Sequence, residues 1–220
     1  MGIFNKKTKS LQVQINEINT DITNLSGGVT ATAIHSVGAA ETTTGISVQE
    51  LGDGAVHKTI ITLASAPMSV VDGSTPATDG AWGKIKLYTF PVGHIKILGG
   101  HQLFPVGGLV ASSSGSGLAA DADFEIGVGT VAASNQHAFD LNNGTEEDIV
   151  PHATVKLTTS ANASIETSVQ GTDAVYDGST TASVAYLNMR TSADGDSGTS
   201  ASTLTCSGTV TIVWTNLGDN

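Results

Sequence analysis

The segment that most constrains the fold of this chain lies near its C-terminal end, where "TLTCSGTVTIVWT" covers residues 203–215. Val210, Ile212 and Trp214 alternate there with threonine and valine. A period of two places alternate side chains on opposite faces of an extended strand, so one face is apolar and the other is largely polar. β-Branched residues favour the same conformation. The segment therefore predicts a β-strand with one buried face.

Further segments carry the same signature of Val, Ile and Thr with bounding glycines. Glycine contributes 26 of the 220 residues and charged residues only 13%, which suits short strands joined by turns better than helices. Within 83–93, the alternation places Lys84, Lys86 and Tyr88 on the face opposite Leu87. The expected strands cover residues 55–65, 68–72, 83–93, 94–100, 122–131, 153–159, 182–190 and 203–215.

These strands, with no convincing second helix, predict an all-β fold that is either a sandwich or a closed sheet. Long loops at 72–83, 111–123 and 192–202 favour a jelly-roll-like β-sandwich over a tight meander. No repeat of constant period is present, which argues against propellers and solenoids. The glycines of "KILGG" predict a hairpin flanked by His94 and His101, which we expect to be surface residues unless they share a metal ion.

One segment near the N-terminus has a different period. "SLQVQINEINTDITNLSGG" covers residues 10–28, and its apolar positions recur in steps of four and three, as in a heptad repeat. Ser10 can cap the start of a helix, and Gly27 and Gly28 can end it. The segment predicts a short amphipathic helix with a seam formed by Leu11, Ile15, Ile18, Ile22 and Leu25.

A helix of this length is marginal alone, so its seam needs a partner. Isoleucine at both core positions of a heptad shifts the preference from dimers towards trimers and tetramers. We therefore expect a parallel trimeric coiled coil that joins three copies of the chain into a homotrimer. Two alternatives remain open, since the helix could instead pack on its own β domain or dock in a groove of a different protein.

Charge is unevenly distributed along the chain, whose formal net charge is −11. Lys6, Lys7 and Lys9 precede the helix in a stretch without acids, whereas the rest of the chain has six basic and twenty acidic residues. An acidic body is repelled by nucleic acid and by anionic membranes, so we expect neither as a partner. The basic leader is a candidate docking element for an acidic partner, and the alternative is a solvated terminus. The expected division is a basic N-terminal arm and amphipathic helix at 1–28 and a β-sandwich domain at 29–220.

Several features indicate synthesis and folding in a reducing cytoplasm. No apolar run approaches the ~20 residues that span a membrane, and the N-terminus lacks the apolar core of a signal peptide. The chain begins Met-Gly, but Lys6 stands where a myristoylation signal has Ser or Thr. Cys206 is the only cysteine, which rules out an intrachain disulfide and predicts a buried, unreactive thiol.

The sequence offers no recognisable catalytic or metal-binding constellation. The six histidines do not form HxxxH or HxH pairs with a nearby carboxylate, so zinc has no support. The acidic stretches at 121–125 and 194–196 lack the EF-hand spacing for calcium. A nucleophile elbow, a P-loop and a dinucleotide fingerprint are also missing. We therefore expect a non-enzymatic protein with no catalytic residues, no metal and no cofactor.

Three quoted stretches carry a family resemblance. "GDGAVHKTIITLASAPMSV", "KLYTFPVGHIKILGG" and "ADFEIGVGTV", within residues 50–131, resemble virion proteins of marine and freshwater tailed phages, including cyanophages. Some of these proteins look like capsid cement or decoration proteins. The resemblance implies a β-rich trimer on the capsid exterior that bridges neighbouring capsomers, with the major capsid protein as its partner and no enzyme activity.

Two functions follow as hypotheses. In a cement protein, the seam would form the trimer and Lys6, Lys7 and Lys9 would dock on the capsid, so that three weak contacts act together. In the alternative, a receptor-binding tail or fibre protein, the helix would end a stalk and the loops would recognise a host surface glycan. Aromatic residues, which often form sugar-binding platforms, make up only 5% of the chain and disfavour the second hypothesis. A hydrolase built on a β-sandwich is a third class, for which candidate residues are lacking.

Overall fold

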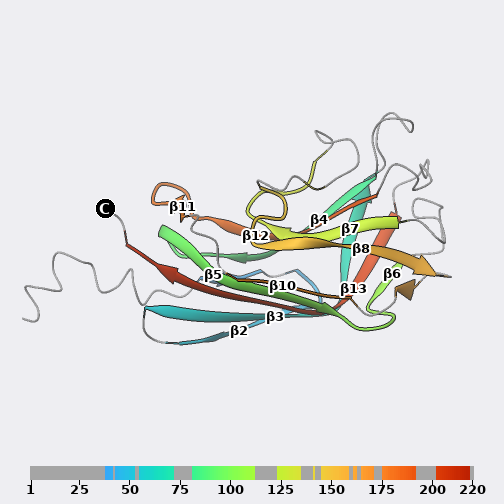
Figure 1. Cartoon of the computed structure of the whole chain (residues 1–220), viewed down its shortest axis with the longest axis horizontal. Helices are drawn as coiled ribbons and strands as arrows, with labels where there is room; N and C mark the ends of the chain where they lie inside the picture. The colour runs from blue at the N-terminus through green and yellow to red at the C-terminus, as the bar shows by residue number, and fades with distance from the viewer. Residues whose placement is uncertain are drawn as a thin grey trace, which may run out of the picture.

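The three-dimensional structure is a computed structural model of the chain (Figure 1). It describes residues 38–41, 43–52, 55–71, 81–111, 123–134, 141, 145–158, 161–162, 165–170, 175–191 and 202–218. Within these residues the chain forms thirteen β-strands and no helix. The all-β class predicted from the alternating segments is therefore confirmed.

The strands vary widely in length, from two residues to sixteen. Most of the expected strands are present with shifted ends, and short strands are added between them. In chain order they are β1 (Ala39–Ala40), β2 (Ile46–Leu51), β3 (Val56–Val71), β4 (Trp82–Thr89), β5 (Gly93–Phe104), β6 (Leu109–Ala111), β7 (Asp123–Gly129), β8 (Val150–Thr158), β9 (Ala161–Asn162), β10 (Ile165–Gln170), β11 (Val175–Gly178), β12 (Val184–Thr191) and β13 (Ser202–Asn216).

The strands belong to one curled sheet that lies on both sides of the core. Hydrogen-bonded neighbours follow the order β10-β5-β13-β6-β9-β8-β7-β12-β4-β3-β2, and β13 also pairs with β3. Figure 1 shows β4, β7, β8 and β12 on one side of the core and β2, β3, β5 and β13 on the other. The two long strands, β3 and β13, connect these sides, because β3 reaches β4 at its end and β13 reaches β6.

Residues 55–65 and 68–72, which we expected to form two strands, belong to the single strand β3. Ser65 adopts a left-handed φ of 58°, and the register of the partner strand β13 shifts between Cys206 and Gly208. The Ser65 N–H donates to Ser207 Oγ at 3.0 Å, which ties the two irregular positions together. A bulge of this kind bends a strand and preserves its pairing on either side. The pair of strands therefore turns a corner of the sheet without ending.

The predicted hairpin at "KILGG" is wrong, because β5 runs without interruption through it. Gly99 and Gly100 pair with Val213 and Ile212 of β13. A Cβ atom at Gly100 would lie 2.6 Å from the side chain of Val150, closer than real contacts allow. The glycine therefore permits close packing inside a strand and does not mark a turn.

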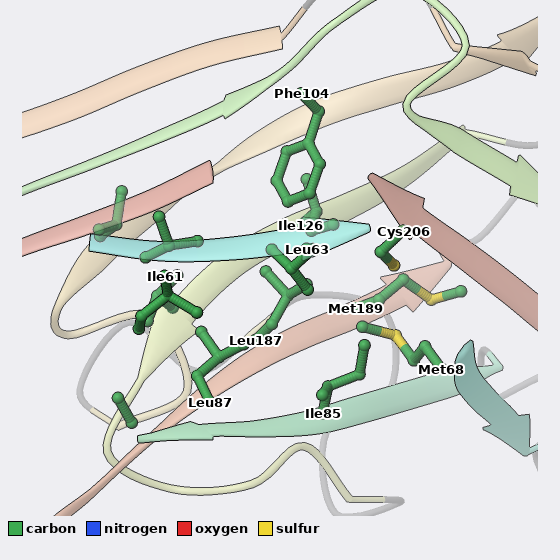
Figure 2. Close-up of a cluster of buried hydrophobic side chains, with 14 of the residues drawn as sticks. Ile61, Leu63, Met68, Ile85, Leu87, Phe104, Ile126, Leu187, Met189 and Cys206 are labelled. Atoms are coloured by element: carbon green, nitrogen blue, oxygen red, sulfur yellow. The ribbon is translucent and has the colours of Figure 1, made fainter. Parts of the chain in front are cut away.

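The core lies between the two sides of the curled sheet. Val210, Ile212 and Trp214 are fully buried, as their alternation predicted. Figure 2 shows part of the same cluster, with side chains contributed by β3, β4, β5, β7, β12 and β13. Each large apolar side chain buried in this way contributes about 1.5–3 kcal/mol of hydrophobic stabilisation.

The prediction for Cys206 is confirmed, and the prediction for Tyr88 is wrong. Cys206 is buried as expected, and burial raises the pKa of its thiol to about 12, so the thiol stays protonated at neutral pH. Tyr88 was expected on the polar face of its strand but is fully buried next to Leu87. A register shift between Ala185 and Tyr186 in the pairing of β12 with β4 interrupts the alternation at this end of β4.

Candidate functional site

The residues predicted to act in assembly lie outside the described residues. This holds for the proposed trimerisation seam, Leu11, Ile15, Ile18, Ile22 and Leu25, and for the proposed docking residues, Lys6, Lys7 and Lys9. Their roles, and the helix at 10–28, stay predictions. Within the described residues, buried polar and charged side chains gather at two places.

The first place is an acid–histidine cluster formed by Glu125, Glu146, Glu147, Asp148 and His152. The His152 ring lies between two carboxylates, with Nε2 3.2 Å from Glu125 Oε1 and Nδ1 in contact with Glu147 Oε2. A neutral imidazole carries one N–H, whereas an imidazolium carries two. The ring can therefore donate to both carboxylates at once only in its charged form.

The carboxylates of this cluster also accept hydrogen bonds from the backbone. Glu125 accepts from the Leu141 N–H at 2.8 Å, and Glu147 accepts from the His152 N–H at 2.8 Å. Asp148 accepts from the backbone and the hydroxyl of Thr130, each at 2.7 Å. Burial raises the pKa of Asp148 above its usual value, although the bonds from Thr130 act in the opposite direction. Buried charges require such partners, and here two of the donors, Thr130 and Leu141, lie in the segment that connects β7 with β8.

Two buried side chains of β12 hold the same connecting segments. Asn188 accepts from the Ala133 N–H at 2.9 Å and donates to the carbonyls of Val131 and Glu146 at 2.8 and 2.7 Å. The Arg190 guanidinium donates to the Ser134 carbonyl. Together with the acid–histidine cluster, these contacts fix the path of residues 130–134 and 145–149 over the sheet.

The arrangement of the acid–histidine cluster matches loop anchoring better than catalysis. A nucleophilic mechanism needs a ring nitrogen directed at a hydroxyl or thiol, but both nitrogens of His152 face carboxylates. Among the described residues, no group of three or more His, Cys, Asp or Glu side chains could hold a metal ion. The imidazole and the carboxylates of the cluster therefore bind one another and backbone groups of the same chain.

The second place is a network centred on Glu50 of β2. Glu50 Oε2 accepts from the Tyr88 hydroxyl at 2.5 Å, and Glu50 Oε1 lies 2.9 Å from His57 Nδ1. His57 is fully buried and stacks on Trp214, with ring centroids 4.2 Å apart. The Trp214 indole N–H donates to Thr59 Oγ1 at 2.8 Å. Burial and the neighbouring carboxylate of Glu50 raise the pKa of Tyr88 above its usual value, so its hydroxyl remains a donor.

The Glu50 network attaches the first described part of the chain to the body. The Tyr88 hydroxyl also accepts from the Gly38 N–H at 2.7 Å. Glu41 forms an ion pair with Lys86 of β4, with a nitrogen–oxygen distance of 2.6 Å. Residues 38–41 and β2 are therefore held against β3 and β4 by side chains as well as by strand pairing.

Histidine–carboxylate pairing is a feature that the sequence did not reveal. Each of the four histidines in the described residues lies within 4.0 Å of a carboxylate, and the partners are Glu50, Glu125 and Glu147, Glu166 and Asp177. His94 and His101 lie on one strand, and each pairs with its own carboxylate on β11 or β10, so they do not face each other across a hairpin. For His94 and His101, only the strand register identifies the partner.

No protein-family model matches the sequence, and no curated protein matches it. In the part of the chain that the structure describes, there is no helix with the length and apolar composition to cross a bilayer. The function therefore has to be inferred from the residues of this chain.

Proposed function

We propose that the chain is a non-enzymatic virion structural protein, a capsid cement or decoration protein that binds the head exterior as a homotrimer. The observation that carries the proposal is the heptad seam of Leu11, Ile15, Ile18, Ile22 and Leu25, directly after a basic leader. The resemblance of residues 50–131 to phage virion proteins supports the same function. The proposal includes an N-terminal helix in a trimeric coiled coil and a jelly-roll-like sandwich for the body.

The mechanism we propose is avidity. Lys6, Lys7 and Lys9 of each copy contact the major capsid protein, and three such contacts on one trimer bind a lattice far more tightly than one. The protein is synthesised in the host cytoplasm and acts on the capsid exterior. No cofactor, nucleic acid or membrane takes part.

The described body suits a protein that carries mechanical load between capsomers. β3 and β13 pair over almost their whole length, from Ser202 opposite Val70 to Thr215 opposite Val56. The strands on both sides of the core share one hydrophobic cluster, so a force on one side is passed to the other through packed side chains. The acid–histidine cluster and the Glu50 network restrain the connecting segments. These features support a rigid structural role.

A pair of matched variants tests the seam. Ile15→Asp with Ile18→Asp places two carboxylates in the seam, whereas Asn16→Asp with Asn19→Asp places the same two charges beside it on the same segment. We expect the first variant to be monomeric and unable to bind heads assembled without the protein. The second should remain trimeric and bind them. A trimeric Ile15→Asp/Ile18→Asp variant in sedimentation velocity would show that the seam assignment is wrong.

Binding partners separate the two functional hypotheses. The full chain is mixed in parallel with heads that lack it and with host cells, and the bound fraction is measured by co-sedimentation. Cement function predicts binding to heads, and Lys6→Glu, Lys7→Glu and Lys9→Glu together should abolish it. Binding to cells without binding to heads would favour the receptor-binding alternative.

A further inference from the structure

The ring of His152 lies where three parts of the acid–histidine cluster meet. The ring comes from β8, Glu125 comes from β7, and Glu147 comes from the connection between these two strands. Glu125 also accepts from the Leu141 N–H at 2.8 Å, so the same carboxylate anchors the middle of that connection. A change at the ring can therefore reach the connecting segment through Glu125.

The two contacts of the ring depend differently on its protons. Nδ1 is in contact with Glu147, whose carboxylate also accepts from the His152 N–H, whereas Nε2 lies 3.2 Å from Glu125 Oε1. A neutral imidazole keeps one N–H, and its other nitrogen carries a lone pair. The contact with Glu147 is the shorter one, so we expect the remaining proton on Nδ1. Nε2 and the Glu125 carboxylate are then two acceptors that face each other, and they cannot form a hydrogen bond.

The charge on the ring is important because the carboxylates around it are shielded from water. The side chains of Glu125 and Glu147 are 11% and 5% exposed, whereas that of His152 is 32% exposed, so the ring can exchange a proton with solvent while its partners stay buried. An ionised carboxylate is costly in such a place unless a cation and hydrogen-bond donors hold it. Burial already raises the pKa of Asp148 in the same cluster. The charged ring offsets a cost that the neutral ring leaves in place.

Other titratable and charged side chains lie on each element next to the ring. Arg190 of β12 lies opposite Glu125 in the strand register and supplies a permanent cation at this place. Histidine is the side-chain type whose charge ordinarily changes between about pH 5 and pH 8, so the ring is the group expected to respond in this range. The remaining groups are Glu125 of β7, Glu146, Glu147 and Asp148 of the connection, Tyr176 of β11, which donates to the Asp148 carbonyl, Glu166 of β10, which pairs with His101, and the exposed Lys156 of β8 itself.

We propose that His152 is a pH-sensitive switch for the connection between β7 and β8. While the ring is charged, it holds Glu125 and Glu147 together. Loss of the Nε2 proton to solvent replaces the Glu125 contact with repulsion between two acceptors, and Glu125 moves away together with the backbone that it anchors at Leu141. The switch lies within the body of one chain, so it does not depend on the homotrimer of the proposed function.

Hydrogen exchange at the Leu141 amide reports on the switch directly, because the acceptor of this amide is Glu125. NMR on the full-length chain measures its protection factor, which removes the intrinsic effect of pH on exchange. Between about pH 5.5 and about pH 8.5, the protection of Leu141 should fall on the order of tenfold, since a hydrogen bond to a charged group is lost. The amide of Ile212, in the middle of β13, should keep its protection.

Two glutamine variants separate the switch from the general pH dependence of the chain. His152→Gln removes the titrating ring and keeps a donor and an acceptor, so the protection of Leu141 should be equal at both pH values. His101→Gln is the matched control, because His101 lies 3.0 Å from the carboxylate of Glu166, whose side chain is 69% exposed. This control should retain the wild-type fall at Leu141.

Glu125→Gln gives a test of opposite sign. Its amide NH₂ group can donate to the lone pair of a neutral ring, and its oxygen can still accept from the Leu141 N–H. A charged ring would instead present an N–H to the NH₂ group. The protection of Leu141 should therefore rise with pH in this variant, which a loss of folding would not produce. Urea unfolding at both pH values verifies that all three variants fold.

The nitrogen chemical shifts of the His152 ring give an independent readout. Both nitrogens should be protonated at the acidic end of the range, and Nδ1 alone at the alkaline end. A ring that stays in one protonation state across the range would overturn the proposal. Equal protection of Leu141 at the two pH values in the wild-type chain would also overturn it, as would a fall that persists in His152→Gln.

Discussion

Replacing Tyr88 with phenylalanine removes one hydroxyl from the Glu50 network and leaves the ring in place. The ring contact with Phe90, at 5.2 Å between centroids, should persist. The variant loses the 2.5 Å bond to Glu50 and the 2.7 Å bond from the Gly38 N–H. A hydrogen bond to a charged group contributes about 1.5–3 kcal/mol, and a partner left unsatisfied adds to the loss. We expect a decrease of about 2–3 kcal/mol in the free energy of unfolding.

Tyr176→Phe is the matched control for this prediction. Its hydroxyl is also partly buried, but it donates one bond, at 3.1 Å, to the neutral backbone carbonyl of Asp148. A neutral bond of this kind contributes about 0.5–1.5 kcal/mol. Urea unfolding measures both variants, and hydrogen exchange should show faster exchange at residues 46–51 in Tyr88→Phe alone. If Tyr88→Phe costs no more than Tyr176→Phe, the Glu50 network does not hold the strand as described.

Two further predictions concern titratable groups. Burial raises the pKa of Asp148 above its usual value, so the folded state binds this proton more tightly than the unfolded state, and wild-type stability falls as pH rises through the pKa. The stability of Asp148→Asn relative to wild type should therefore increase between about pH 3 and pH 7 in urea titrations, and a flat difference would contradict this prediction. Because burial raises the pKa of Cys206 to about 12, a thiol reagent at pH 8 should label the native chain at least a hundredfold more slowly than the unfolded chain, whereas similar rates would show that the thiol is accessible.

The fold class could be predicted because it depends on a local pattern. Val210, Ile212 and Trp214 needed only their spacing to be assigned to a buried face. The continuity of β3 could not be predicted, because it depends on one left-handed residue, Ser65, opposite a shifted register in a strand more than 130 residues away. Likewise, Gly99 and Gly100 resemble a turn in sequence, and the proximity of Val150 to Gly100 is visible only in the fold.

The histidine–carboxylate contacts could not be predicted from the sequence either, because they depend on contacts between distant parts of the chain. His152 meets Glu125, and His101 meets Glu166, across strands that are distant in sequence. A search for local histidine motifs cannot find such pairs, because the register that brings them together is a property of the folded sheet. The residues proposed to act in assembly, Leu11 to Leu25, are the opposite case, because their heptad spacing can be recognised in the sequence alone and their proposed partner is another copy of the chain.

We propose that copies of this chain associate in threes through the seam near the N-terminus. Sedimentation equilibrium of the full-length protein at micromolar concentration tests it most directly. We expect a species of three times the 22.2 kDa chain mass, which Ile15→Asp with Ile18→Asp should convert to single chains. A wild-type species of 22.2 kDa across the concentration range would contradict it.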